Sequence, residues 1–302
     1  MKNIIIKNEV NKALTLKKAV VALESAVITH GLPRPINFQT ARSMEEAVRS
    51  ENAAPATICL WEGQIRVGLD HEEIEMLANN DDAIKISLRD IAGVINNKMN
   101  GGTTVAATMA VANIVNISVF ATGGIGGVHR DSCFDISADL PMLSKTPMLV
   151  VCSGAKSILD LPATREYLET YAIPVIGYQT DAMPAFFSTD SGLKVDYRFD
   201  TCKDIADFAI THWSLGFPSA VLVTVPPPKD KAIDNDIINS AISEALIQAK
   251  SAQITGAAIT PFLLKRVNEI TESKSMAVNI ALLVNNSHIA GKLAFYLSEM
   301  AT

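Results

Sequence analysis

Residues 148–160 read MLVVCSGAKSILD, and this stretch decides the fold class. The apolar run 148–152 predicts a buried strand, because a short continuous apolar run bounded by turn residues is typical of strands covered on both faces. Ser153 and Gly154 end the strand, and a helix is predicted after them. A buried strand followed by a helix is the repeating unit of α/β proteins.

The same alternation recurs along the chain. Further strands are predicted at 20–23, 56–61, 64–69, 84–87, 119–121, 175–178 and 220–225. Helices are predicted at about 38–48, 71–78, from 89, after 101–104, and at 237–249, 261–270 and 278–300. We therefore predict one domain spanning residues 1–302, with a three-layer α/β/α fold around a central mixed, mostly parallel sheet.

Turn residues set several boundaries within this pattern. Glu62-Gly63 predicts a hairpin between two strands. The stretch 29–35 contains one glycine and two prolines, which predicts an irregular loop, and Asn37 is expected to cap the helix that follows. In a mostly parallel sheet, ligands bind beyond the carboxyl ends of the strands, where the unusual residues of this chain lie.

Composition excludes several classes of function. The 302 residues are 48% hydrophobic with a formal net charge of −6 and no long basic run, which argues against a nucleic-acid partner. No segment approaches the roughly 20 apolar residues that span a bilayer, and the first apolar run is too short for a secretory signal. The scattered cysteines predict reduced thiols in a cytoplasmic protein without a zinc site: Cys59, Cys133, Cys152 and Cys202.

A glycine-rich loop at 122–130 reads TGGIGGVHR. Closely spaced glycines allow backbone amides to approach an anion, and His129 and Arg130 could complete a phosphate site. The loop matches neither the dinucleotide fingerprint nor the P-loop, and a merely flexible loop is the alternative. Residues 101–104, GGTT, are expected to open a helix whose first turn also favours anions.

Two segments carry charged groups suited to chemistry. Asp135-Ile136-Ser137-Ala138-Asp139 offers oxygen ligands for Mg²⁺ or Mn²⁺, although a helix cap and a solvated aspartate are the more common explanation of such a segment. Lys156 follows a buried strand near an expected helix start, where burial and the helix dipole would lower its pKa. A neutral lysine is a nucleophile that forms Schiff bases, and a surface lysine is the alternative.

Three further polar residues lie in apolar surroundings. Glu24 ends a predicted strand, where burial would raise its pKa and suit it to proton transfer; a structural pair with an arginine is the alternative. Lys85 lies within a strand and would pair with Glu24 or contact an anionic substrate. Asn279 lies in an apolar helix, where an amide needs a hydrogen-bond partner, most simply on another helix.

Taken together, these stretches resemble the pseudouridine-5′-phosphate glycosidases, also called pseudouridylate synthases and classed with the carbon–oxygen lyases. The matching motifs span nearly the whole chain: ALESAVITHGLPRPIN, ATICLWEGQIRVGL, GGTTVAATM, ATGGIGGVHR, FDISADL, CSGAKSILDLPATREYLE, GYQTDAMPAF, ITPFLL and NIALLVNN. The resemblance implies reversible cleavage of pseudouridine 5′-phosphate to uracil and ribose 5-phosphate. It also implies an α/β/α fold, a homotrimer and one Mn²⁺ ion per subunit.

The resemblance also implies roles for individual residues. Lys156 would attack C1′ of the ribose, Glu24 would act as the acid and base, and Asp135 would bind the metal. The implied substrate contacts are Lys85, Val105, Thr122, His129, Ser137, Ala138, Asp139 and Asn279. Thr122 and His129 resemble the residues on the phosphate side, and Asn279 resembles an amide on the base side.

One departure from the family pattern keeps other functions open. Residues 225–228 read Val-Pro-Pro-Pro where the family has Asn-Pro-Ile-Pro, so an expected amide is absent. The alternatives are an enzyme of the same fold acting on another phosphorylated C-glycoside or sugar, and a non-catalytic descendant that binds nucleotides.

Overall fold

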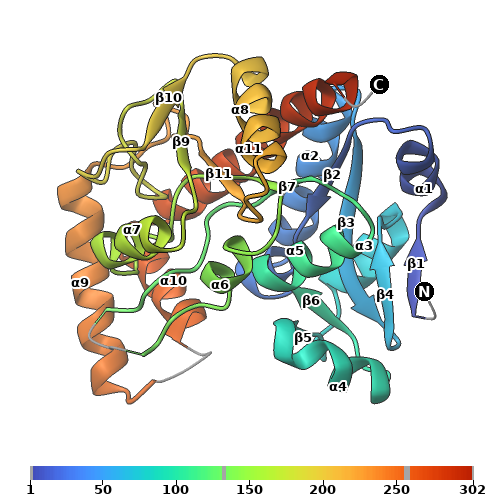
Figure 1. Ribbon diagram of the computed structural model, residues 1–302. Helices are drawn as coiled ribbons and strands as arrows, with labels where there is room; N and C mark the ends of the chain where they lie inside the picture. Colours follow the sequence, from blue (N-terminus) through green and yellow to red (C-terminus); the bar gives the residue numbers. More distant parts are fainter. Residues whose placement is uncertain (1–2, 131–133, 255–258, 301–302) are drawn as a thin grey trace.

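The computed structural model describes residues 3–130, 134–254 and 259–300. Its centre is an eleven-stranded sheet in the order β1-β4-β3-β2-β7-β8-β11-β9-β10, with β6 paired to β3 and β5 to β6 (Figure 1). Among the described strands only the β3–β4 and β3–β6 pairs are antiparallel. The strands are β1 Ile4–Ile6, β2 Val20–Leu23, β3 Ala54–Trp61, β4 Gln64–Val67, β5 Ile84–Ile86, β6 Gly101–Thr103, β7 Val119–Ala121, β8 Leu149–Cys152, β9 Val175–Tyr178, β10 Tyr197–Phe199 and β11 Val221–Thr224.

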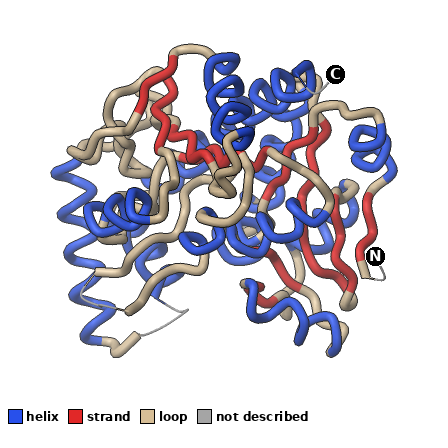
Figure 2. The backbone as a smooth tube through the Cα atoms, in the orientation of Figure 1, coloured by secondary structure: helices blue, strands red, loops and turns tan. Residues whose placement is uncertain are grey.

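Helices cover both faces of the sheet, as predicted (Figure 2). On one face α11 contacts α2, α8 and strands β2, β7 and β8, while on the other α5 contacts β2, β3 and α6. The α-helices are α1 Asn8–Thr15, α2 Ile36–Arg49, α3 His71–Ala78, α4 Ile91–Asn96, α5 Val105–Ile114, α6 Asp139–Leu143, α7 Leu161–Thr170, α8 Cys202–Ser214, α9 Asn235–Ser251, α10 Ile259–Ile270 and α11 Lys274–Met300. The mixed, mostly parallel three-layer α/β/α prediction is confirmed.

Local sequence accounts for the confirmed boundaries. Glu62 and Gly63 both have positive φ angles, 49° and 71°, which is the geometry of a two-residue hairpin turn. Asp70 and Glu73 form a reciprocal capping box at the start of α3. The predicted helix 71–78 coincides with α3 because these two side chains satisfy the first free backbone amides.

Several predictions for residues 29–104 were wrong. Val27–Gly31 forms a π-helical turn, so the irregular segment begins only after Gly31. Asn37 does not cap α2; it lies in the first turn and donates to the carbonyls of Ile28 (2.8 Å) and Ala78 (3.0 Å). Gly101–Thr103 is strand β6 rather than a helix start, and Thr104 caps α5.

The described cysteines are unpaired, and the lengths and hydropathies of the described helices bear on membrane insertion. Cys59, Cys152 and Cys202 are buried free thiols, and Cys133 lies outside the described residues. Within the described ranges we find no helix whose length and hydropathy would let it cross a membrane.

Candidate active site

Three polar side chains follow three neighbouring parallel strands. Glu24 follows β2, Thr122 follows β7 and Ser153 follows β8, and the three strands are adjacent in the sheet. Because parallel strands end at the same edge, these residues stand side by side at the carboxyl edge.

The short strands β5 and β6 bring Lys85 to the same place. The first half of β3, Ala54–Thr57, pairs with β2, and its second half, at Cys59–Leu60, pairs with β6. Strand β6 therefore lies beside β3 just beyond the point where β2 ends at Leu23. Lys85 of β5 is in register with Gly102 of β6. The lysine therefore lies beyond the carboxyl end of β2, where Glu24 is found.

Glu24 is a buried carboxyl group, 8% exposed, next to opposing charges. Burial raises its pKa above the usual 4.5, and the charge of Asp139 acts in the same direction. The charges of Lys156 and Lys85 and a hydrogen bond from the Thr122 hydroxyl to Oε1 oppose this rise. Among the described residues Glu24 forms no ion pair with an arginine, so the purely structural alternative is not supported.

Lys85 and Lys156 are both half-buried and lie within electrostatic reach of Glu24. Burial lowers the pKa of Lys85, and the charge of Lys156 lowers it further, while Glu24 and Asp139 act against the shift. Lys156 is thus not a lysine in bulk solvent. The expected helix start does not adjoin it, however, since α7 begins only at Leu161 with Asp160 as its cap.

The glycine-rich loop is held closely against its neighbours. An added Cβ at Gly124 would lie 2.5 Å from Cδ2 of Phe186, and one at Gly126 would lie 2.2 Å from Oγ of Ser137. The amide of Ile125 donates to the Gly154 carbonyl, and the amide of Lys156 donates back to Ile125, both at 3.1 Å. The loop and the Lys156 segment are therefore joined as a short parallel pair.

Much of the expected anion-binding capacity of this loop is used within the protein. The amide of Gly126 donates to Asp139, that of Val128 to Thr164 and that of His129 to the Asp135 carbonyl. The Arg130 guanidinium donates to two carbonyls of the 157–159 segment, each at 3.1 Å. These glycines therefore allow close packing of the loop, and a phosphate contact stays a prediction.

Asp139 joins three parts of the site. Its Oδ1 accepts from the Ala106 amide at 2.9 Å and its Oδ2 from the Gly126 amide at 2.7 Å. Asp139 is 6% exposed, so the solvated-aspartate alternative is wrong for this residue. The Oγ of Ser137 accepts from the Asp139 amide at 3.2 Å.

The remaining predicted residues surround this centre with less defined contacts. Val105 is buried as the first residue of α5, while Asp135, Ala138 and His129 are half-buried. Asn279 is half-buried on α11, and its side chain makes no hydrogen bond with other described residues, so the expected bond between helices is not found.

The described residues contain no group of three or more His, Cys, Asp or Glu side chains able to share a metal ion. Both oxygens of Asp139 already accept backbone amides. An ion at Asp135 would therefore take most of its ligands from water and substrate, which is compatible with Mg²⁺ or Mn²⁺ but not with a closed protein cage.

Sequence reasoning missed Asn286, a fully buried amide on α11. Its Nδ2 donates to the Thr122 carbonyl at 2.9 Å and lies 3.2 Å from Oγ of Ser153. The signal was present in the motif NIALLVNN, where this asparagine follows Asn279 by two helical turns, but only Asn279 was selected.

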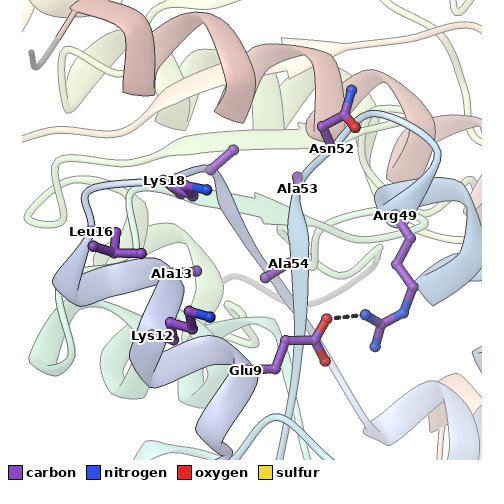
Figure 3. Close-up of a pocket in the computed structure, with 10 residues that line it drawn as sticks. Glu9, Lys12, Ala13, Leu16, Lys18, Arg49, Asn52, Ala53 and Ala54 are labelled. Atoms are coloured by element: carbon purple, nitrogen blue, oxygen red, sulfur yellow. Dashed lines mark hydrogen bonds and ion pairs between the residues drawn. The ribbon is translucent and has the colours of Figure 1, made fainter.

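Two surface hollows lie apart from this centre. One of about 370 Å³ is lined by α1, the end of α2 and the first residues of β3, beside the Glu9–Arg49 ion pair (Figure 3). Since it lies at the amino ends of β2 and β3, it is at the opposite edge of the sheet from Glu24. Another of about 430 Å³ lies between Glu51, Tyr178, Cys202 and Tyr296.

The sequence matches the family model for indigoidine synthase A like protein over residues 9–296. The chain belongs to this family. A pseudouridine-5′-phosphate glycosidase of Caldanaerobacter subterraneus subsp. tengcongensis is 47% identical over 98% of this chain and 97% of that protein. One from Geobacillus kaustophilus is 48% identical over 98% and 99%. The resemblance noted from the motifs is confirmed.

Two solved structures of the family share the fold. The prealnumycin C-glycosynthase AlnA, in complex with ribulose 5-phosphate, has a TM-score of 0.92 and 39% identity over 100% of this chain and 99% of its own. An indigoidine synthase A-like protein of Thermotoga maritima has a TM-score of 0.90 and 33% identity over 98% and 97%.

Proposed function

We propose that this protein is an enzyme that cleaves the C–C glycosidic bond of pseudouridine 5′-phosphate, giving uracil and ribose 5-phosphate through a Schiff base on Lys156. One observation carries the proposal: a half-buried lysine lies within electrostatic reach of a buried glutamic acid whose pKa is raised by burial. The relatives named as pseudouridine-5′-phosphate glycosidases, 47% and 48% identical over nearly their full length, support the choice of substrate.

The proposed chemistry uses Lys156 as nucleophile and Glu24 as proton carrier. The Nζ atom bonds to C1′ as the C1′–O4′ bond breaks, and O4′ takes the proton of Glu24. The new ammonium then returns a proton to Glu24. A carboxyl group whose pKa is raised by burial is suited to this exchange.

The second stage separates the base from the sugar. The nitrogen lone pair forms a C=N bond as the C1′–C5 bond breaks, and C5 of uracil takes the proton of Glu24. Water then hydrolyses the imine and releases ribose 5-phosphate. Each step is reversible in principle, so uracil and ribose 5-phosphate should also yield the C-glycoside in vitro.

We propose that the remaining predicted residues serve binding. Lys85 would face the sugar phosphate, Asp139 would hold the site together, and Asp135 would hold a divalent ion, Mn²⁺ by family resemblance, that orders charge around the substrate. The homotrimer and the cytoplasmic location are part of the same proposal.

The test is uracil release from pseudouridine 5′-phosphate, followed by trapping of ribose 5-phosphate with borohydride. We expect turnover and one adduct on Lys156. Lys156→Ala should abolish both, whereas Lys145→Ala, at an exposed lysine after α6, should change neither. A wild-type protein that releases no uracil, or that turns over without the Lys156 amine, would refute the proposal.

A second candidate is action on another phosphorylated C-glycoside. The AlnA structure with a bound ketose phosphate favours it, as does the Val225-Pro-Pro-Pro segment, whose first amide donates to the Cys152 carbonyl directly before the Lys156 segment. Comparing release of uracil with release of other C-linked aglycones separates the two. A non-catalytic descendant would show binding of ribose 5-phosphate with no trapped adduct.

A further inference from the structure

Asn286 lies at the junction between the two segments that carry the proposed catalytic groups. It is 0% exposed, and its amide reaches the Thr122 carbonyl at 2.9 Å and the Ser153 hydroxyl at 3.2 Å. The Ser153 hydroxyl also lies 3.4 Å from Oδ1 of Asn286. One side chain of α11 thus contacts the residues that directly follow β7 and β8.

Both contacts lead directly to a catalytic group. Thr122 donates its hydroxyl to Glu24, so the placement of its backbone decides where that hydroxyl points. Ser153 begins the segment that ends at Lys156, and its amide donates to the Gly123 carbonyl at 2.8 Å. These bonds connect Glu24 to Lys156 through Asn286.

Because Asn286 is buried, losing either of these hydrogen bonds would be costly. Buried polar groups that lose a partner are costly, so the amide and its two acceptors hold one another in place. The neighbouring Ser287 is equally buried, but its hydroxyl donates only within its own helix, to the Leu283 carbonyl at 2.8 Å. Asn286 therefore differs from Ser287 in linking α11 to the catalytic edge of the sheet.

We propose that Asn286 is a positioning residue for the reaction: its amide fixes the Thr122 backbone and the Ser153 side chain and thereby holds the carboxyl group of Glu24 and the amine of Lys156 at their working separation. The role in catalysis rests on the proposed function, whereas the mechanical link between the two segments does not. A displacement of about 1 Å at a reacting group can reduce turnover by up to about 100-fold.

The first experiment measures the link without a substrate. Hydrogen exchange followed by mass spectrometry should show faster exchange in peptides covering 122–126 and 153–156 for Asn286→Leu, which keeps a similar branched shape. Ser287→Ala should leave these peptides as protected as in the wild type. Equal protection in Asn286→Leu and wild type would overturn the proposal, whatever the enzyme acts on.

The second experiment measures catalysis. Asn286→Leu should lower kcat for uracil release by about 10- to 100-fold with little change in KM, while Ser287→Ala retains wild-type values. Combined with Thr122→Val, the loss should be much smaller than the product of the two single losses, because both changes disturb the same hydroxyl. Independent, multiplicative losses would contradict a shared path to Glu24.

The pH profile distinguishes positioning from general loosening. Glu24 faces Lys156 after β8, Lys85 of β5, Asp139 of α6 and the Thr122 hydroxyl, which lowers its pKa. Asn286→Leu should therefore move the kcat/KM limb of Glu24 to higher pH, as Thr122→Val does. If Asn286→Leu does not fold, Ser153→Ala tests the other contact and should lower kcat severalfold at unchanged KM; an unchanged kcat there would refute the link.

If the wild-type protein releases no uracil, the proposed function is wrong, but the hydrogen-exchange experiment still tests the link made by Asn286. Failure of the proposed function can therefore be distinguished from failure of the positioning role.

Discussion

Gly126→Ala tests whether the glycine-rich loop exists for close packing. The new Cβ would lie 2.2 Å from Oγ and 2.6 Å from Cβ of Ser137, and 2.8 Å from Oδ2 of Asp139. Ser137 cannot retreat easily, because its own amide donates to the Gly127 carbonyl at 3.0 Å. Either the loop moves away or the segment carrying Ser137 and Asp139 does.

The expected cost follows from this overlap. Forcing an extra methyl group into a packed interior typically costs about 1–3 kcal/mol. For domains of 150–250 residues each kcal/mol lowers Tm by roughly 2–4 °C, and a chain of this length belongs at the lower end. Because the hydrogen bond from the Gly126 amide to Asp139 would also lengthen, we expect kcat/KM for uracil release to fall by about 100-fold.

Differential scanning calorimetry and a uracil-release assay measure both effects. Gly93→Ala is the matched control: an added Cβ at Gly93 in α4 meets no atom within 4 Å, so this substitution should stabilise the helix by about 0.5–1 kcal/mol and leave turnover unchanged. If Gly126→Ala melts and turns over like the wild type, close packing of this loop is not required.

Three further predictions follow from the charges of the site and the core. Thr122→Val removes a hydrogen bond that lowers the pKa of Glu24, which must be protonated to start the reaction, so the alkaline limb of kcat/KM should move to higher pH; a limb that stays in place would count against Glu24 as the titrating group. Burial raises the pKa of Glu45 above its usual 4.5, so the folded state binds that proton more tightly than the unfolded state. The free energy of unfolding should fall as pH rises from about 4.5 through the folded-state pKa, and Glu45→Gln should flatten this fall in urea titrations; an equal slope would contradict it. Chelation should reduce turnover and Mn²⁺ should restore it, whereas Asp135→Asn should respond to neither; a variant restored like the wild type would exclude Asp135 as the ligand.

Continuous apolar runs and local turn chemistry were enough to predict most of the sheet. Val20–Leu23 and Leu149–Cys152 are fully buried runs that no helical pattern explains, and the Glu62-Gly63 turn needs no distant partner. Among the three-residue strands, β5 and β7 were predicted, whereas β1, β6 and β10 were not. Strands this short derive much of their stability from neighbours far along the chain, as in the pairing of Cys59 with Gly102.

The sequence suggested the residues of the candidate site one by one, but it did not suggest how they are arranged. The proximity of Lys85 to Glu24 depends on β6 replacing β2 beside β3, a pairing that no local pattern encodes. Motif resemblance supplied Asn279, whereas the amide with buried partners is Asn286. Seven residues separate the two, so they lie on nearly the same stripe of α11, and helical spacing alone cannot tell which one is enclosed.

The two buried carboxyl groups of the site differ in what holds them, and this difference is consistent with the roles proposed for them. Both oxygens of Asp139 accept backbone amides, one from α5 and one from the glycine-rich loop, so both are engaged within the protein. Among the described residues Glu24 receives a single hydrogen bond, from Thr122 to Oε1. Burial raises the pKa of Glu24 against two nearby lysines, so small movements of those charges shift its protonation. Different surroundings for paired acids are how one site separates a structural carboxylate from a proton carrier. Exchanging the two functions would therefore require rebuilding the loop at Gly126, not merely moving a side chain.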